Sequence, residues 1–120
     1  MIFKKIRKSF KYAYAGCKYF IQERNIKIHI AATILVILGG IFFNINYLEW
    51  IAIVISISLV ISFEILNTVI EDLIDMLHPH KDHKAMIIKD LAAAAVFVSA
   101  ISSVIVGLMI FIPRILERLQ

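Results

Sequence analysis

The chain has 120 residues, of which 61% are hydrophobic and only 18% are charged. A soluble domain of this size buries a modest share of its surface and has a lower apolar content, so the composition excludes an ordinary small soluble protein. One cysteine excludes a disulfide framework within the chain, and the net charge of +4 comes mainly from lysines and arginines near the N-terminus.

Residues 2–21 are predicted to form an amphipathic helix at a membrane surface. Apolar side chains recur at helical spacing on one side, and lysines occupy the opposite side. A basic amphipathic helix usually lies in the interface, with its lysines near anionic headgroups. Two interpretations remain open: the lysines only anchor the topology, or they also meet a phosphorylated substrate.

Three membrane-spanning helices are predicted, at about residues 28–45, 48–77 and 90–112. Two runs without Asp, Glu, Lys or Arg, 28–48 and 91–113, are 21 and 23 residues long. About 20 apolar residues are enough to cross a bilayer. The middle helix is apolar over its first half and acidic afterwards. We therefore expect an all-α integral membrane protein.

The placement of Lys and Arg predicts the orientation of these helices. Eleven of them lie before the first span or in the loop between the second and third spans, and two lie in the C-terminal tail. Loops rich in Lys and Arg face the cytoplasm. The N-terminus and the second loop are therefore expected to be cytoplasmic, and the C-terminus to lie outside.

The second loop, HPHKDHK, covers residues 78–84. Pro79 is expected to end the preceding helix, because proline interrupts a helix interior. The spacing of His78, His80 and His83 matches no common zinc motif, and cysteine ligands are absent. We expect a solvated loop that contacts a nucleotide or nothing.

A polar stripe interrupts the second half of the middle helix. Five polar residues recur at i, i+3, i+4, i+7 and i+11, which places them on one helix face. The stripe consists of Glu64, Asn67, Thr68, Glu71 and Asp75, with Asp72 at its edge. Because ionisable groups inside a membrane are costly and usually functional, the stripe predicts a site. The alternative is that Glu64, protonated or paired with a lysine, only joins helices.

Other charges are expected at the same membrane interface. Glu23 lies at the entrance of the first span, and Lys89 and Asp90 lie at the entrance of the third. Carboxylate and amide oxygens suit Mg²⁺, and a lysine suits a phosphate. These are the components of phosphoryl transfer. No glycine-rich phosphate loop is present, so side chains and metal would have to hold any nucleotide.

Three motifs carry a resemblance to a known family. They are E-R-N-x-x-I-H at 23–29, E-I-L-N-T-x-x-E-x-x-x-D at 64–75 and A-x-x-x-K-D-x-A-A at 85–93. Together they resemble the bacterial diacylglycerol kinase and undecaprenol kinase family, over about residues 10–106. The resemblance implies a single membrane lipid kinase domain over 1–120 in the bacterial cell membrane. It also implies a homotrimer with active sites at subunit boundaries.

The resemblance also implies roles for individual residues. Glu64 matches the general base that takes the proton from the lipid hydroxyl. Glu23 and Glu71 match the carboxylates that bind Mg²⁺ with ATP, and Asn67 lies between base and metal. Lys89 and Asp90 match the nucleotide site. Further candidates are His80, Lys81, Asp82, Lys11 and Lys4 for ATP, and Tyr12 and Asn25 for the lipid.

The first motif also bears on the identity of the lipid. The form of the first motif resembles the Gram-positive branch of the family, which is similar to undecaprenol kinases, so undecaprenol is the expected substrate and diacylglycerol the alternative. No nucleic-acid partner is expected. An alternative of another class is a small cation or proton transporter, or a structural membrane subunit. In a transporter, however, the acids would usually lie near the bilayer midplane.

Overall fold

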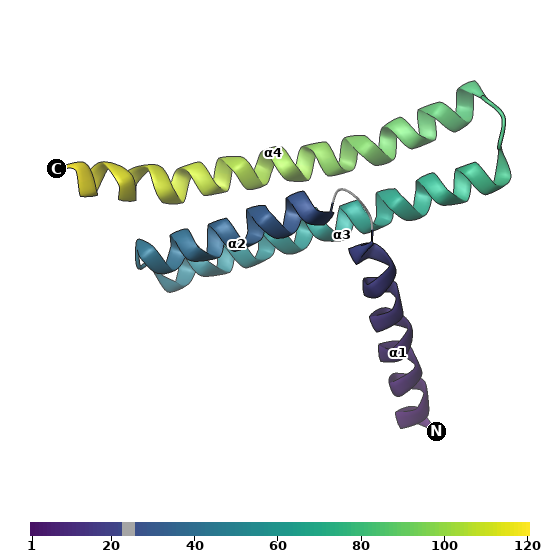
Figure 1. The fold of residues 1–120 in the computed structure, drawn as a ribbon, viewed down its shortest axis with the longest axis horizontal. Helices are drawn as coiled ribbons and strands as arrows, with labels where there is room; N and C mark the ends of the chain where they lie inside the picture. Colours follow the sequence, from purple (N-terminus) through teal and green to yellow (C-terminus); the bar gives the residue numbers. More distant parts are fainter. Residues whose placement is uncertain (23–25) are drawn as a thin grey trace. The chain divides into compact units, whose positions relative to one another are not determined.

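The computed structural model describes residues 1–22 and 26–120, and helices account for nearly all of them (Figure 1). The helices are α1 (Ile2–Ile21), α2 (Ile26–Phe42), α3 (Tyr47–Leu77) and α4 (His83–Leu119). The prediction of an all-helical fold is confirmed. The chain divides into two units, Met1–Leu35 and Val36–Gln120.

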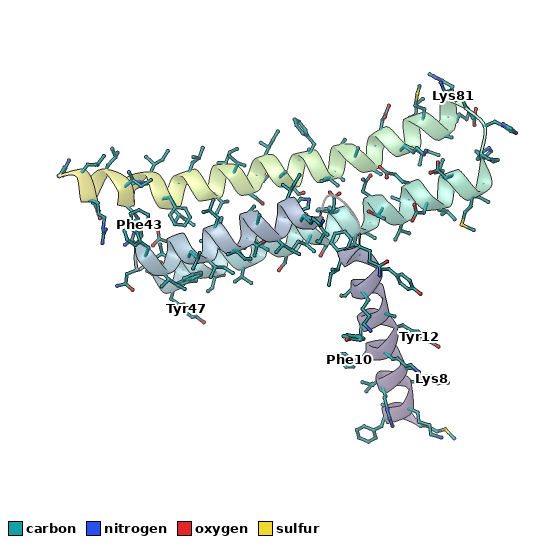
Figure 2. The ribbon with its side chains drawn as sticks, in the orientation of Figure 1. Lys8, Phe10, Tyr12, Phe43, Tyr47 and Lys81 are labelled. Carbon is teal, nitrogen blue, oxygen red and sulfur yellow. The ribbon has the colours of Figure 1, made fainter. Side chains whose placement is uncertain are left out.

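Helix α1 is amphipathic, and nearly all of its side chains are exposed. Lys8, Phe10 and Tyr12 project from it in Figure 2. On the same helix the Lys18 ammonium lies 5.1 Å from the centre of the Tyr14 ring, within the range of a cation–π contact. The helix thus presents both apolar and basic surface to its surroundings.

The turn between α2 and α3 is built by a glycine and an asparagine. Asn44 adopts φ 53°, a left-handed conformation that asparagine tolerates better than most residues. The N–H groups of Asn44 and Ile45 donate to the carbonyls of Ile41 and Gly40, over 3.2 and 3.1 Å, which is a Schellman closure of α2. A Cβ on Gly40 would lie 2.6 Å from the Trp50 ring, so this close approach requires glycine.

Helix α3 begins with a capping box. Asn46 Oδ1 accepts from the Glu49 N–H over 2.9 Å, and Glu49 Oε1 accepts from the Asn46 N–H over 3.0 Å. Both bonds satisfy backbone donors that the first turn of a helix leaves without partners. At its other end α3 stops one residue before His78, which cannot continue the helix easily because Pro79 follows it.

Helices α3 and α4 pack against each other as an antiparallel pair (Figure 1). Ile45, Ile53 and Ile110 form a buried cluster at the end of the pair that adjoins the α2–α3 turn. This end, residues 42–53 and 110–118, is called the turn end below. The opposite end, residues 64–90 around the α3–α4 loop, is called the loop end. In Figure 2, Phe43 marks the turn end and Lys81 marks the loop end.

Helix α4 is longer than the apolar run that it contains. It begins at His83 and continues through Pro113 to Leu119. A proline in a helix interior removes one backbone hydrogen bond, which is tolerated here near the C-terminal end. A helix of 37 residues is about 55 Å long, more than the roughly 30 Å of a bilayer core. The helix is therefore long enough to extend beyond the hydrocarbon core.

Two of the helices, α3 and α4, are long and apolar enough to cross a membrane, and α1 with α2 add a third candidate span if the two are taken together. Helix α2 has 17 residues, at the lower limit for a membrane-spanning helix. Most large apolar side chains of α3 and α4 are exposed within the single chain. Such extensive apolar surface is typical of contact with lipid or with other membrane helices.

Candidate functional site

The polar stripe lies on the half of α3 that approaches the loop end. Asn67 Nδ2 donates a hydrogen bond to Glu71 Oε1 over 3.2 Å, one helical turn further on. Within the described part of the chain, the buried Oδ1 of Asn67 has no hydrogen-bond partner. The Glu71 carboxylate is exposed, so the two side chains offer an amide oxygen and a carboxylate side by side.

Glu64 is the deepest member of the stripe. Only 5% of the residue is exposed, and among the described residues it is the one charged residue that is buried. The Thr68 hydroxyl donates a hydrogen bond to the backbone carbonyl of Glu64 over 3.0 Å, which links two members of the stripe. An ionisable side chain that is buried in a membrane-spanning helix is typical of a functional site.

A cross-helix ion pair lies beyond Glu71 at the loop end. The Lys89 ammonium of α4 donates to the Asp75 carboxylate of α3. Both side chains line a pocket of about 440 Å³ beneath the α3–α4 loop. The predicted loop candidates His80, Lys81 and Asp82 line the same pocket. Four residues predicted for a nucleotide site, His80, Lys81, Asp82 and Lys89, therefore line one pocket together with Asp75.

The remaining predicted site residues are exposed or lie outside the described residues. Asp90 is exposed on α4, next to Lys89. Lys4, Lys11 and Tyr12 are exposed on α1. The predicted metal ligand Glu23 and the predicted lipid contact Asn25 lie outside the described residues, so their roles stay predictions.

The residues of the stripe fit a magnesium ion that arrives with a nucleotide. Over residues 1–22 and 26–120, no three His, Cys, Asp or Glu side chains are grouped to hold a metal by themselves. Mg²⁺ is usually bound through one or two carboxylates together with substrate phosphates, and it prefers oxygen ligands. Glu71 and the unpartnered Oδ1 of Asn67 supply such oxygens.

Sequence reasoning placed Asp75 on the stripe but gave it no partner. It also gave no role to Glu49, which caps α3 and pairs with Arg114 of α4. Asp75 and Lys89 lie a few residues to each side of the short α3–α4 loop, whereas nothing comparable links Glu49 with Arg114, which are 65 residues apart. Antiparallel helices joined by a short connection bring such positions together.

Comparison with known proteins places the chain in a family. The family model for prokaryotic diacylglycerol kinase matches residues 11–111, which is most of the chain. The chain belongs to the prokaryotic diacylglycerol kinase family. It is therefore a transmembrane lipid kinase, and the resemblance inferred from the three motifs is confirmed.

Two relatives of this family member are named as lipid kinases. The undecaprenol kinase of Bacillus subtilis is 39% identical over 93 residues, covering 78% of this chain and 76% of that protein. The diacylglycerol kinase of Synechocystis is 36% identical over 111 residues, covering 91% of this chain. The match covers 63% of the Synechocystis protein, so the chain spans less than two thirds of that relative's length.

Proposed function

We propose that this family member transfers the γ-phosphate of ATP to the hydroxyl of undecaprenol at the inner face of a bacterial membrane. The observation that carries the proposal is the buried Glu64 carboxylate, placed on one helix face with Asn67 and Glu71. A transporter would use the same residue types. Family membership favours the kinase over that alternative.

Glu64 is the proposed general base. As the lipid oxygen attacks the γ-phosphorus, its proton passes to the Glu64 carboxylate; a new O–P bond forms, the bond to the β-phosphate oxygen breaks, and ADP leaves. A carboxylate within reach of the acceptor hydroxyl can take its proton as the O–P bond forms. The burial of Glu64 also suits an acceptor hydroxyl that stays in the bilayer.

Glu71, Asn67 and Glu23 are the proposed holders of Mg²⁺ with ATP, and Lys89 and Asp90 the proposed nucleotide contacts. When bound, the ion would neutralise charge on the phosphates. Asn67 then has two tasks, because its amide N–H orients Glu71 while its oxygen remains available. About 10 Å along the helix separates Glu64 from Glu71, which leaves room for a phosphate between base and metal.

The proposed arrangement has three membrane spans, with the N-terminus and the loop end in the cytoplasm and the C-terminus outside. The exposed apolar surface of α3 and α4 supports contact with further copies in a homotrimer. The pocket beneath the loop, where His80, Lys81 and Asp82 meet Lys89, would then face the nucleotide. Lys4, Lys11 and Tyr12 of α1 are proposed as supporting contacts to ATP and lipid.

Undecaprenol and diacylglycerol are the two candidate acceptor lipids. The higher identity to the Bacillus subtilis undecaprenol kinase and the form of the first motif support undecaprenol. The longer match to the Synechocystis diacylglycerol kinase supports diacylglycerol as the second candidate. Both lipids end in one hydroxyl on an apolar tail, so the reaction chemistry is the same for either.

The experiment is a phosphorylation assay of the purified full chain in detergent, with Mg²⁺, labelled ATP, and undecaprenol and diacylglycerol in competition. Label is expected mainly in undecaprenyl phosphate. Label mainly in phosphatidic acid would overturn the choice of lipid but would still support the proposed kinase activity. If neither lipid, alone or together, accepts label, the kinase proposal itself fails. A Glu64→Gln sample in the same assay controls for contaminating kinases.

A further inference from the structure

The ion pair between Asp75 and Lys89 joins the two helices, and both residues line the pocket beneath the loop. The Lys89 side chain is 36% exposed and that of Asp75 is 62% exposed. Exposed ion pairs contribute little to folding stability, because water screens them. The Asp75–Lys89 pair is therefore expected to contribute little to the stability of the fold.

The pair does limit where the Lys89 ammonium can be. A lysine is a point charge on a flexible four-carbon stem, so an unpaired one samples many positions. The ammonium has three N–H donors, and the bond to Asp75 uses one. Two donors remain for an anion in the pocket that both residues line.

Asp75 also continues the polar stripe. It lies four residues after Glu71 on the same helix face, and Glu71 accepts from Asn67. The stripe on α3 thus reaches Lys89 on α4 through Asp75. A group that binds Glu71 through a metal and Lys89 through a phosphate would lie against this row of side chains.

We propose that Asp75 is a positioning residue, which holds the Lys89 ammonium at the pocket for the phosphates of a nucleotide and acts only through Lys89. This inference rests on the proposed function. Asp75 itself repels a polyphosphate, so its removal has two opposite effects. The loss of a positioned cation slows transfer, while the loss of a negative charge does not weaken ATP binding.

The test compares Asp75→Ala with Asp72→Ala in the purified full chain. Asp72 is an exposed carboxylate on the same helix, so the control removes the same charge without touching the pair. Asp75→Ala is expected to lower kcat by up to about 100-fold, the scale of a misplaced positioning group, with KM for Mg-ATP unchanged or lower. Asp75→Glu is expected to recover most of kcat, because it restores a carboxylate within reach of Lys89.

A second readout follows Lys89 directly. The rate at which acetic anhydride acetylates Lys89, measured by mass spectrometry, is expected to rise severalfold in Asp75→Ala and to stay unchanged in Asp72→Ala. The neutral amine is the reactive form, and Asp75 stabilises the ammonium. If Asp75→Ala does not fold, Asp75→Asn, which keeps the size, takes its place in both measurements.

Two results would overturn the inference alone: a kcat for Asp75→Ala equal to that of Asp72→Ala, or a Lys89 acetylation rate that does not respond to Asp75. In both, wild-type activity stays intact. If instead the wild-type chain phosphorylates no lipid alcohol, the proposed function fails, and the inference with it.

Discussion

The two ends of the α3–α4 helix pair carry the same kind of contact in different surroundings. At the turn end, Glu49 of α3 pairs with Arg114 of α4, and their side chains are 20% and 27% exposed. At the loop end, Asp75 pairs with Lys89, and theirs are 62% and 36% exposed. The pair at the turn end is largely shielded from solvent, whereas the pair at the loop end lines a pocket.

The turn end is supported from several sides. Glu49 also closes the capping box of α3, and the Arg118 guanidinium lies 4.2 Å from the centre of the Phe42 ring. Neighbouring residues include the buried cluster around Ile53. Glu49, Arg114 and Arg118 each have a structural partner there, so this end holds the helices together. The loop end keeps donors and acceptors available, as a binding site must.

The largest expected effect is on kcat, and it is tested by making the same Glu→Gln substitution at each end of the helix pair. Glu64→Gln should lower kcat by about 100- to 10,000-fold, the usual contribution of a general base, with nucleotide binding retained. Glu49→Gln makes the same chemical change on the same helix at the turn end, and folded protein should keep its kcat. Steady-state assays with a lipid alcohol measure both. A Glu64→Gln enzyme with wild-type turnover would remove the proposed base.

The second expected effect concerns the metal. Glu71→Gln removes a carboxylate from the pair that it forms with Asn67. The Mg²⁺ concentration for half-maximal activity should rise at least about tenfold, which is the scale of losing one metal-site contact. A Mg²⁺ titration at saturating ATP measures it, with Asp72→Asn as the neighbouring control. Equal midpoints in both variants would argue against a metal role for Glu71.

The third effect is on stability and belongs to the turn end. Glu49→Gln keeps an oxygen that can accept from the Asn46 N–H but leaves Arg114 without its carboxylate, which should cost about 1–2 kcal/mol, the scale of a charged donor left without its partner. Thermal unfolding in detergent is the measurement, and Glu117→Gln, an exposed carboxylate on α4, is the control. The double variant Glu49→Gln with Arg114→Gln should recover part of the loss. A Glu49→Gln protein as stable as Glu117→Gln would contradict the structural role.

The smallest effect is that of the cation–π contact. Arg118→Ala should destabilise the protein by about 0.5–1 kcal/mol, as expected for such a contact at an exposed position. Arg118→Lys keeps the charge and should retain part of this energy. The same unfolding measurement detects the difference, while activity per folded molecule should not change. Loss of activity in Arg118→Ala without loss of stability would mean that the two ends are coupled.

Much of the fold follows from patterns that are local in the sequence. The helices and the polar face with Glu64, Asn67 and Glu71 follow from helical periodicity. Pro79 predicts where α3 stops, because its effect acts on the preceding residue. Asn46 and Glu49 have the spacing of a capping box, yet they received no role, since the same residues also fit an ordinary interfacial loop.

The sequence by itself determined the helical class, the apolar runs, the stripe on α3 and, through three motifs, the family. Only the tertiary structure decided which charges are partners. Glu49 and Arg114 are 65 residues apart, and Asp75 and Lys89 are 14 apart. The physical reason is that periodicity describes one helix alone, while a partner on the next helix depends on the register that the connecting loop and the packing of α3 on α4 impose.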